Sequence, residues 1–173
     1  TYTTNGQTPD SAGTSTAIHS GFKTKSGLIG LSNSSKRGDC TSEKKELESI
    51  MDVFKQLGKS VGLVTNTRVT HATPAAVYAH SFDRNWEDDS KVPEDCLQDD
   101  IALQLINSNI DLVLGGGRRH FLPIEVLNQK GKRKDSRNLI EEFKTNGGVF
   151  LNDNNDFKNY KIDSNKRLIG LFS

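Results

Sequence analysis

The sequence is poor in long hydrophobic runs, in aromatic residues and in net charge, and each shortage excludes a class of protein. No apolar stretch approaches the ~20 residues that span a bilayer, so we predict no transmembrane segment in this chain. The formal net charge of +1 gives no electrostatic reason to expect nucleic acid as a partner. A basic cluster at residues 130–134 lacks interleaved aromatic side chains, and we interpret it as a solvated loop.

Cysteine is also scarce, since only Cys40 and Cys96 are present and neither belongs to a CxxC pair. A zinc knuckle or a thioredoxin-like site is therefore not expected. The two thiols fit either two inert buried cysteines or one disulfide in a secreted protein, and their polar surroundings favour pairing. Residues 33–35 form a glycosylation sequon with Asn33 as the acceptor, which fits a secretory route. The chain has no initiating Met, and both of its ends read as cut.

Apolar periodicity predicts helices that alternate with short strands. We expect helices at residues 11–20, 47–57, 74–81, 97–107 and 136–145, strands at 27–31, 60–65, 110–114, 149–151 and 168–172, and polar loops at 85–95 and 152–165. The strand at 60–65 has the pattern of a fully buried strand. This alternation predicts a single α/β domain whose largely parallel central sheet is flanked by helices.

The segment TPDSAGT at residues 8–14 places Ser11 at the start of a predicted helix. Unsatisfied N–H groups and the positive end of the helix dipole favour an anion such as phosphate there. A serine in that position serves as a nucleophile when a base or a metal lowers the cost of ionising its hydroxyl. From this motif alone, however, an ordinary helix cap at Asp10 or Ser11 is the more frequent outcome.

Two further segments offer polar groups near the predicted edge of the sheet. His71 and Thr73 follow a strand, at the edge where ligands of α/β proteins collect. Thr73 offers a hard oxygen ligand and His71 an imidazole, although Thr73 could instead cap a helix that begins at Pro74. Arg84 is either a surface charge near a helix end or a fork for two phosphate oxygens. The three glycines at residues 115–117 are not followed by Lys and Ser or Thr, so they do not form a P-loop.

Taken together, these segments resemble the animal-type alkaline phosphatases over nearly the whole chain. The resemblance is carried, in order, by TYTTNGQTPDSAGTSTA, VGLVTNTRVTHATPAAVYAH, DRNW, QDDIA, LGGGR and LIGLF. It implies that residues 1–173 are the N-terminal to middle portion of a catalytic domain that hydrolyses phosphate monoesters with two Zn²⁺ and one Mg²⁺. Carried over residue by residue, Ser11 would form a phosphoserine and also bind zinc, Arg84 would bind the phosphate, and Asp10 would position Arg84.

The same resemblance implies that the Thr73 hydroxyl binds magnesium and that His71 lies just outside the direct magnesium ligands. It also implies a disulfide between Cys40 and Cys96. Ser15 and Asp83 depart from the family pattern, and an acid at position 83 is expected to weaken phosphate binding or to alter its pH dependence.

Most zinc ligands of the family are expected outside this chain, because its four histidines show no metal-pair spacing. We therefore expect the isolated 173 residues to be inactive, and the alternative function is a catalytically incomplete phosphate-binding or interaction fragment. A phosphodiesterase or sulfatase of the same fold is a weaker alternative. Family members are usually secreted or held at the cell surface by a lipid anchor, and they are usually homodimers, so we expect the same of this protein.

Overall fold

The computed structural model describes residues 2–124, 131–163 and 165–172, so Lys130 of the basic cluster lies outside the described residues. The helices are α1 (Ser11–Ser20), α2 (Ile50–Gln56), α3 (Ala72–Ala75), α4 (Ile101–Asn107), α5 (Leu139–Thr145) and α6 (Asn154–Asn159), with short 3₁₀ turns η1 (Asp89–Lys91) and η2 (Arg118–Phe121). The strands are β1 (Gly62–Arg68), β2 (Leu112–Gly116), β3 (Val149–Leu151) and β4 (Leu168–Leu171).

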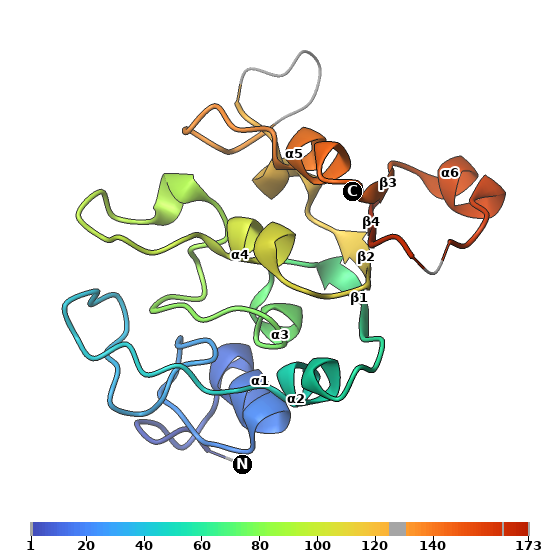
Figure 1. The fold of residues 1–173 in the computed structure, drawn as a ribbon. Coiled ribbons are helices and arrows are strands. Elements are labelled where there is room, and N and C mark those ends of the chain that lie inside the picture. The colour runs from blue at the N-terminus through green and yellow to red at the C-terminus, as the bar shows by residue number, and fades with distance from the viewer. Residues whose placement is uncertain (1, 125–130, 164, 173) are drawn as a thin grey trace.

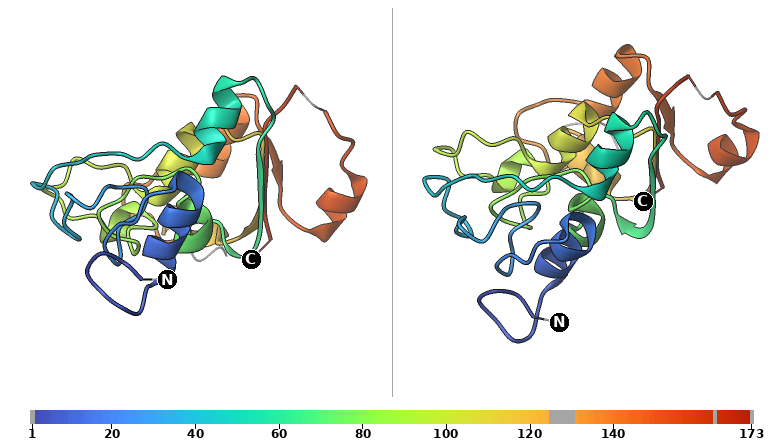
Figure 2. Two further views of the ribbon diagram at one scale, coloured as in Figure 1. Left: turned by 90° about the horizontal axis from the view of Figure 1, so that it is seen from below. Right: turned by 60° about the horizontal axis from the view of Figure 1, so that its bottom comes forward.

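The four strands form one parallel sheet in the order β1-β2-β4-β3, which confirms the predicted α/β fold (Figure 1). In Figure 2 the helices α2, α4 and α5 lie on one side of the sheet and α6 lies on the other. The main core fills the space between the sheet and α4 and α5, where Leu105, Val113, Leu139 and Leu171 are fully buried. The carboxyl end of β1 leads directly into α3, which packs against α1.

The strand β1 is less buried than its sequence predicts. It lies at the edge of the sheet among the described residues, and its Val64 side chain is 70% exposed. A central strand of a parallel sheet has neighbours on both edges and cover on both faces, whereas β1 has one neighbouring strand in the described part of the chain. The apolar pattern therefore identified the strand correctly but not its burial.

The expected strand at residues 27–31 is wrong. The segment makes only isolated bridges, from Ile29 to Ser81 and from Leu31 to Glu46. Gly27 and Gly30 both have positive φ angles, of 86° and 60°, which interrupt an extended ladder. The apolar side chains of this segment are fully buried, so the hydrophobic run reflects core packing rather than strand pairing.

One helix prediction and one loop prediction also need correction. The helix expected at 74–81 is only the short α3, after which the chain turns so that Ser81 can pair with Ile29. The predicted loop at 152–165 contains α6, whose N-cap Asp153 accepts hydrogen bonds from the N–H groups of Asn155 and Asp156. An N-cap aspartate is a signal for the start of a helix, but the polar composition of this segment favoured a loop prediction.

The basic cluster is not simply a solvated loop, because the Arg133 side chain is fully buried. Its guanidinium lies 2.9 Å from Asp100 and also donates to Asp135 from Nε at 3.1 Å. Asp89 lies 3.8 Å away. A buried guanidinium is tolerated because these carboxylates compensate its lost hydration.

Cys40 and Cys96 form a disulfide with a Cα–Cα distance of 5.6 Å, the pairing that the resemblance implied. The bridge lies beside the fully or largely buried side chains of Leu31, Phe82 and Trp86. It fastens the loop that follows residue 31 to the segment that precedes α4. Within the residues that the structure describes, no helix is both long enough and apolar enough to cross a membrane.

Candidate active site

Ser11 is the first residue of α1, and Asp10 is the N-cap of that helix. The Asp10 carboxylate accepts a hydrogen bond of 2.9 Å from the N–H of Gly13. Gly21, with a φ angle of 77°, ends the helix. Because Asp10 caps the helix, the half-buried Ser11 hydroxyl is left without a hydrogen bond to any of the described residues. It therefore remains available at the helix start, where backbone N–H groups favour an anion.

The Asp10 carboxylate also holds two other groups of the site. Its Oδ2 accepts the N–H of Gly27 at 3.0 Å and the Nη1 of Arg84 at 3.2 Å. The backbone N–H of Arg84 donates to the Gly27 carbonyl at 2.9 Å. The side chains of Asp10 and Arg84 are 23% and 22% exposed, so the guanidinium is anchored and still reachable from solvent. One carboxylate thus links the helix that carries Ser11 to Arg84.

His71 lies on the other side of the Arg84 guanidinium. The Nη2 of Arg84 lies 3.3 Å from Nε2 of His71. Because a guanidinium can only donate, Nε2 must accept, and the imidazole is therefore neutral with its proton on Nδ1. Burial, together with the positive charges of Arg84 and Arg68, lowers the pKa of His71 and favours this neutral form. The buried Nδ1 has no hydrogen-bond partner among the described residues.

Thr73 lies in the first turn of α3 and so does not cap this helix, which was the alternative to a ligand role for its hydroxyl. The helix begins at Ala72, with His71 as an N-cap that makes no side-chain cap bond. The Thr73 side chain is exposed, and its hydroxyl makes no hydrogen bond within the described parts of the chain. The buried Ser15 hydroxyl donates to the Thr73 carbonyl at 2.5 Å, so α1 and α3 are tied together one turn from Ser11.

The side chains of Ser11, Thr73 and His71 fit part of a metal centre. The hydroxyl oxygens of Ser11 and Thr73 are hard ligands, which magnesium prefers, and the orphaned Nδ1 of His71 fits an additional polar group such as water. A zinc ion needs about three protein ligands. In residues 2–124, 131–163 and 165–172, no group of three or more His, Cys, Asp or Glu side chains could hold a metal ion. The two hydroxyl oxygens therefore suit magnesium, and the described residues do not supply the cluster of three side chains that a zinc ion needs.

Sequence reasoning missed Glu87, which anchors the end of β1 beside the site. Arg68 donates two hydrogen bonds of 2.8 Å to its carboxylate, and the Thr70 hydroxyl donates a third of 2.6 Å. Burial opposes ionisation of Glu87, but these hydrogen bonds outweigh it and lower the pKa of the carboxyl. The two partners lie 19 and 17 positions away, so no local pattern indicated the contact.

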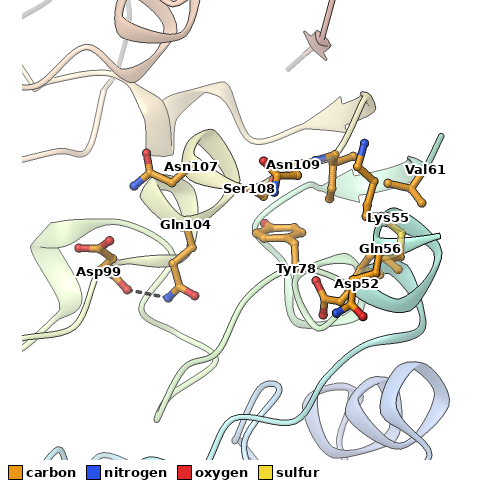
Figure 3. A pocket seen from close by; sticks show the side chains of 13 residues that line it. Asp52, Lys55, Gln56, Val61, Tyr78, Asp99, Gln104, Asn107, Ser108 and Asn109 are labelled. Atoms are coloured by element: carbon orange, nitrogen blue, oxygen red, sulfur yellow. Dashed lines mark hydrogen bonds between the residues drawn. The ribbon is translucent and has the colours of Figure 1, made fainter. Parts of the chain in front are cut away.

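A hollow of about 550 Å³ lies apart from these side chains, between α2 and α4 (Figure 3). Figure 3 shows Tyr78 at its centre, with Lys55 on one side and Gln104 on the other. None of Asp10, Ser11, His71, Thr73 and Arg84 lines it. The hydrogen-bonding groups of its wall are largely satisfied within the protein, as for Gln104, which donates to the Asp99 carbonyl at 2.8 Å. The candidate active site is therefore the surface around Ser11 and Arg84 rather than this hollow.

A parallel α/β sheet with a serine, an anchored arginine and hydroxyl ligands near its edge is an arrangement suited to binding a phosphate ester. Comparison with known proteins identifies the family, since the family model described as "Alkaline phosphatase" matches residues 1–173. The chain belongs to the alkaline phosphatase family. It is 43% identical over 159 residues to the tissue-nonspecific alkaline phosphatase of Homo sapiens, an alignment that covers 84% of this chain and 30% of the human protein.

Solved structures show the same fold. The crystal structure of Thermus thermophilus alkaline phosphatase matches with a TM-score of 0.76 and 28% identity, over 99% of this chain and 30% of that one. A mutant alkaline phosphatase from the Antarctic bacterium TAB5, with Mg bound in its M3 site, matches with a TM-score of 0.70 and 24% identity, over 100% of this chain and 41% of that one. The chain thus spans about a third of the length of the relatives that it matches.

Proposed function

We propose that this chain carries the nucleophile and the phosphate-binding arginine of a phosphomonoesterase. The observation that supports this most directly is the Asp10 carboxylate, which caps the helix of Ser11 and also binds the Arg84 guanidinium. Family membership supports the same reaction class, the hydrolysis of phosphate monoesters. In this proposal the residues form part of a longer catalytic domain, whose remaining segments complete the metal site.

The roles of the side chains follow from their chemistry. The Ser11 oxygen attacks the phosphorus of a phosphate monoester while the bond from phosphorus to the alcohol oxygen breaks, so the alcohol leaves with the proton that the serine loses; water then hydrolyses the phosphoserine to inorganic phosphate and free serine. Arg84 donates from its guanidinium to phosphate oxygens, where negative charge is greatest in the transition state. Asp10 and His71 hold the guanidinium from two sides, which reduces the number of orientations that substrate binding must restrict.

Two zinc ions and one magnesium ion are the metals that the family membership suggests, and the magnesium bound to the TAB5 mutant supports the latter. When bound, zinc favours the ionised serine hydroxyl and offsets charge on the leaving oxygen. Ser11 would hold zinc, the Thr73 hydroxyl would hold magnesium, and His71 would stay just outside the magnesium ligands. Most zinc ligands would come from segments beyond these residues, because the described part of the chain has no suitable cluster.

The cellular setting is part of the proposal. The disulfide between Cys40 and Cys96 and the exposed sequon at Asn33 both suit a secreted or cell-surface protein, and a lipid anchor is the surface attachment that we propose. A homodimer is the proposed assembly, and phosphate monoesters are the proposed substrates. The lack of a metal cluster in the described residues favours the second candidate for the chain taken alone, a catalytically incomplete phosphate-binding fragment.

Hydrolysis of p-nitrophenyl phosphate tests the proposal, measured on the metal-loaded longer protein that includes the segments proposed to complete the metal site, hereafter called the metal-loaded protein. Ser11→Ala should lower kcat by more than about a thousandfold, because the attacking oxygen is lost. Ser20→Ala is the matched control, since Ser20 ends the same helix and its hydroxyl contacts only nearby backbone, donating to the Thr16 carbonyl at 2.7 Å and accepting the Phe22 N–H at 3.2 Å. A Ser11→Ala protein as active as the Ser20→Ala protein would exclude Ser11 as the nucleophile.

A further inference from the structure

Asp83 places a carboxylate directly before Arg84, the proposed phosphate-binding residue, in the chain. An unpaired acid there would repel a phosphate anion. The structure shows that it is paired. Arg37 donates from Nε to Oδ2 at 2.9 Å and from Nη2 to Oδ1 at 3.2 Å, a two-pronged contact. The N–H of Asn85 donates to Oδ1 at 2.8 Å, so three hydrogen bonds hold the carboxylate.

Arg37 also packs over the backbone that joins the parts of the site. Gly27 has a φ angle of 86°, and a Cβ atom on it would lie 2.3 Å from Cδ of Arg37. The N–H of this glycine donates to Asp10 and its carbonyl accepts from the backbone of Arg84. The Arg37 side chain thus contacts the one peptide segment that hydrogen-bonds both of these residues.

The loop that carries Arg37 is itself fixed. The N–H of Gly38 donates to the Phe82 carbonyl at 3.0 Å, and the disulfide begins two residues later at Cys40. The hydrogen bond to Asp83 raises the pKa of Arg37, and the negative charge of Asp10 adds to this shift. Arg37 therefore keeps a full positive charge, which interacts with the carboxylates of Asp83 and Asp10.

We propose, on the basis of the proposed function, that Arg37 is a positioning residue for phosphate binding. It offsets the charge of Asp83 and holds the segment of Arg84 in place. The side chains of Arg37 and Asp83 are 43% and 17% exposed, so the pair contributes little to folding stability. Its effect should therefore be measurable in phosphate affinity rather than in unfolding.

The test is competitive inhibition by inorganic phosphate in the metal-loaded protein, with kcat and KM measured separately. Arg37→Ala should weaken phosphate inhibition about fivefold and raise KM by a similar factor, with kcat changed less than about twofold. Arg37→Gln, which keeps a donor but loses the charge, should behave in the same way if packing is preserved. Asp83→Asn alone should strengthen phosphate inhibition, by up to about fivefold, because the positive charge of Arg37 is then uncompensated.

The double variant gives the readout that a purely structural role would not. Asp83→Asn placed in the Arg37→Ala protein should restore phosphate inhibition to within about twofold of the wild type, because the uncompensated charge is gone. Failure of this rescue would overturn the electrostatic role of Arg37. Arg137→Ala is the matched control, since Arg137 makes a similar two-pronged contact with Glu142 in the α5 region, and it should leave phosphate inhibition unchanged.

Arg84→Ala separates failure of this inference from failure of the proposed function. If Arg84→Ala weakens phosphate inhibition and Arg37→Ala does not, only the role of Arg37 is refuted. If Arg84→Ala also leaves phosphate inhibition unchanged, the proposed phosphate site is wrong.

Discussion

Replacing Arg84 by lysine tests the geometry of the site, because lysine keeps the positive charge but lacks the two Nη groups with which arginine donates to separate partners. In the structure, Nη1 of Arg84 contacts Asp10 at 3.2 Å while Nη2 contacts His71 at 3.3 Å. A lysine ammonium is a single point charge and cannot hold both partners while it also presents two donors to phosphate. We expect Arg84→Lys to lose one charge-assisted hydrogen bond to phosphate, worth about 1.5–3 kcal/mol, or roughly tenfold to a hundredfold in affinity.

The assay is inhibition of p-nitrophenyl phosphate hydrolysis by inorganic phosphate. Arg137→Lys is the matched control. Arg137 likewise uses two nitrogens of its guanidinium, since Nε and Nη2 both donate to the carboxylate of Glu142, a residue of α5 outside the site. That pair is exposed, so its change should cost no more than about 1 kcal/mol of stability and leave phosphate affinity unaltered. Phosphate affinity within about twofold of the wild type in Arg84→Lys would show that the paired Nη donors of Arg84 are not needed for phosphate binding.

Three further predictions concern stability. Ser15→Ala should lower the free energy of unfolding, measured in urea, by about 1 kcal/mol, because the hydrogen bond of 2.5 Å from the Ser15 hydroxyl to the Thr73 carbonyl is lost. An unchanged free energy of unfolding would argue against this hydrogen bond. Ser136→Gly should raise the free energy of unfolding by about 0.5 kcal/mol, because Ser136 has a φ angle of 61° and the strain of this conformation for serine exceeds the entropy that a glycine loses on folding. A lower melting temperature of the variant would contradict this prediction. Replacing Cys40 and Cys96 by serine should cost about 4 kcal/mol, since the bridge closes a loop with a sequence separation of 56; a loss below about 1 kcal/mol would contradict the estimate.

The sequence predicted elements best where local signals agree with tertiary packing. The helix at residues 11–20 matches α1 because an N-cap aspartate, small residues and a C-terminal glycine all act within the segment. The helix expected at 47–57 exists but begins at Ile50. Ser49 and Asp52 form a capping box there, with a hydrogen bond of 2.8 Å from the Ser49 N–H to the Asp52 carboxylate. This S-x-x-D pattern was available in the sequence and would have corrected the start.

The rest could not be predicted from local patterns, because it depends on contacts between distant segments. A hydrophobic run indicates burial without telling whether the backbone pairs as a strand, which is why residues 27–31 were misassigned. The pairing of Arg37 with Asp83 spans 46 positions, and that of Arg133 with Asp100 spans 33. The residues of the candidate site were indicated by motif and resemblance, whereas the hydrogen bonds that organise them required the fold.

In the proposed mechanism the Ser11 hydroxyl attacks phosphorus. The most direct measurement is to incubate the metal-loaded protein with inorganic phosphate at low pH, quench it and map the modified residue by peptide mass spectrometry. We expect phosphate on Ser11 in the wild type and no phosphoserine in Ser11→Ala. Phosphate on a different residue of the active protein, with Ser11 unmodified, would contradict it.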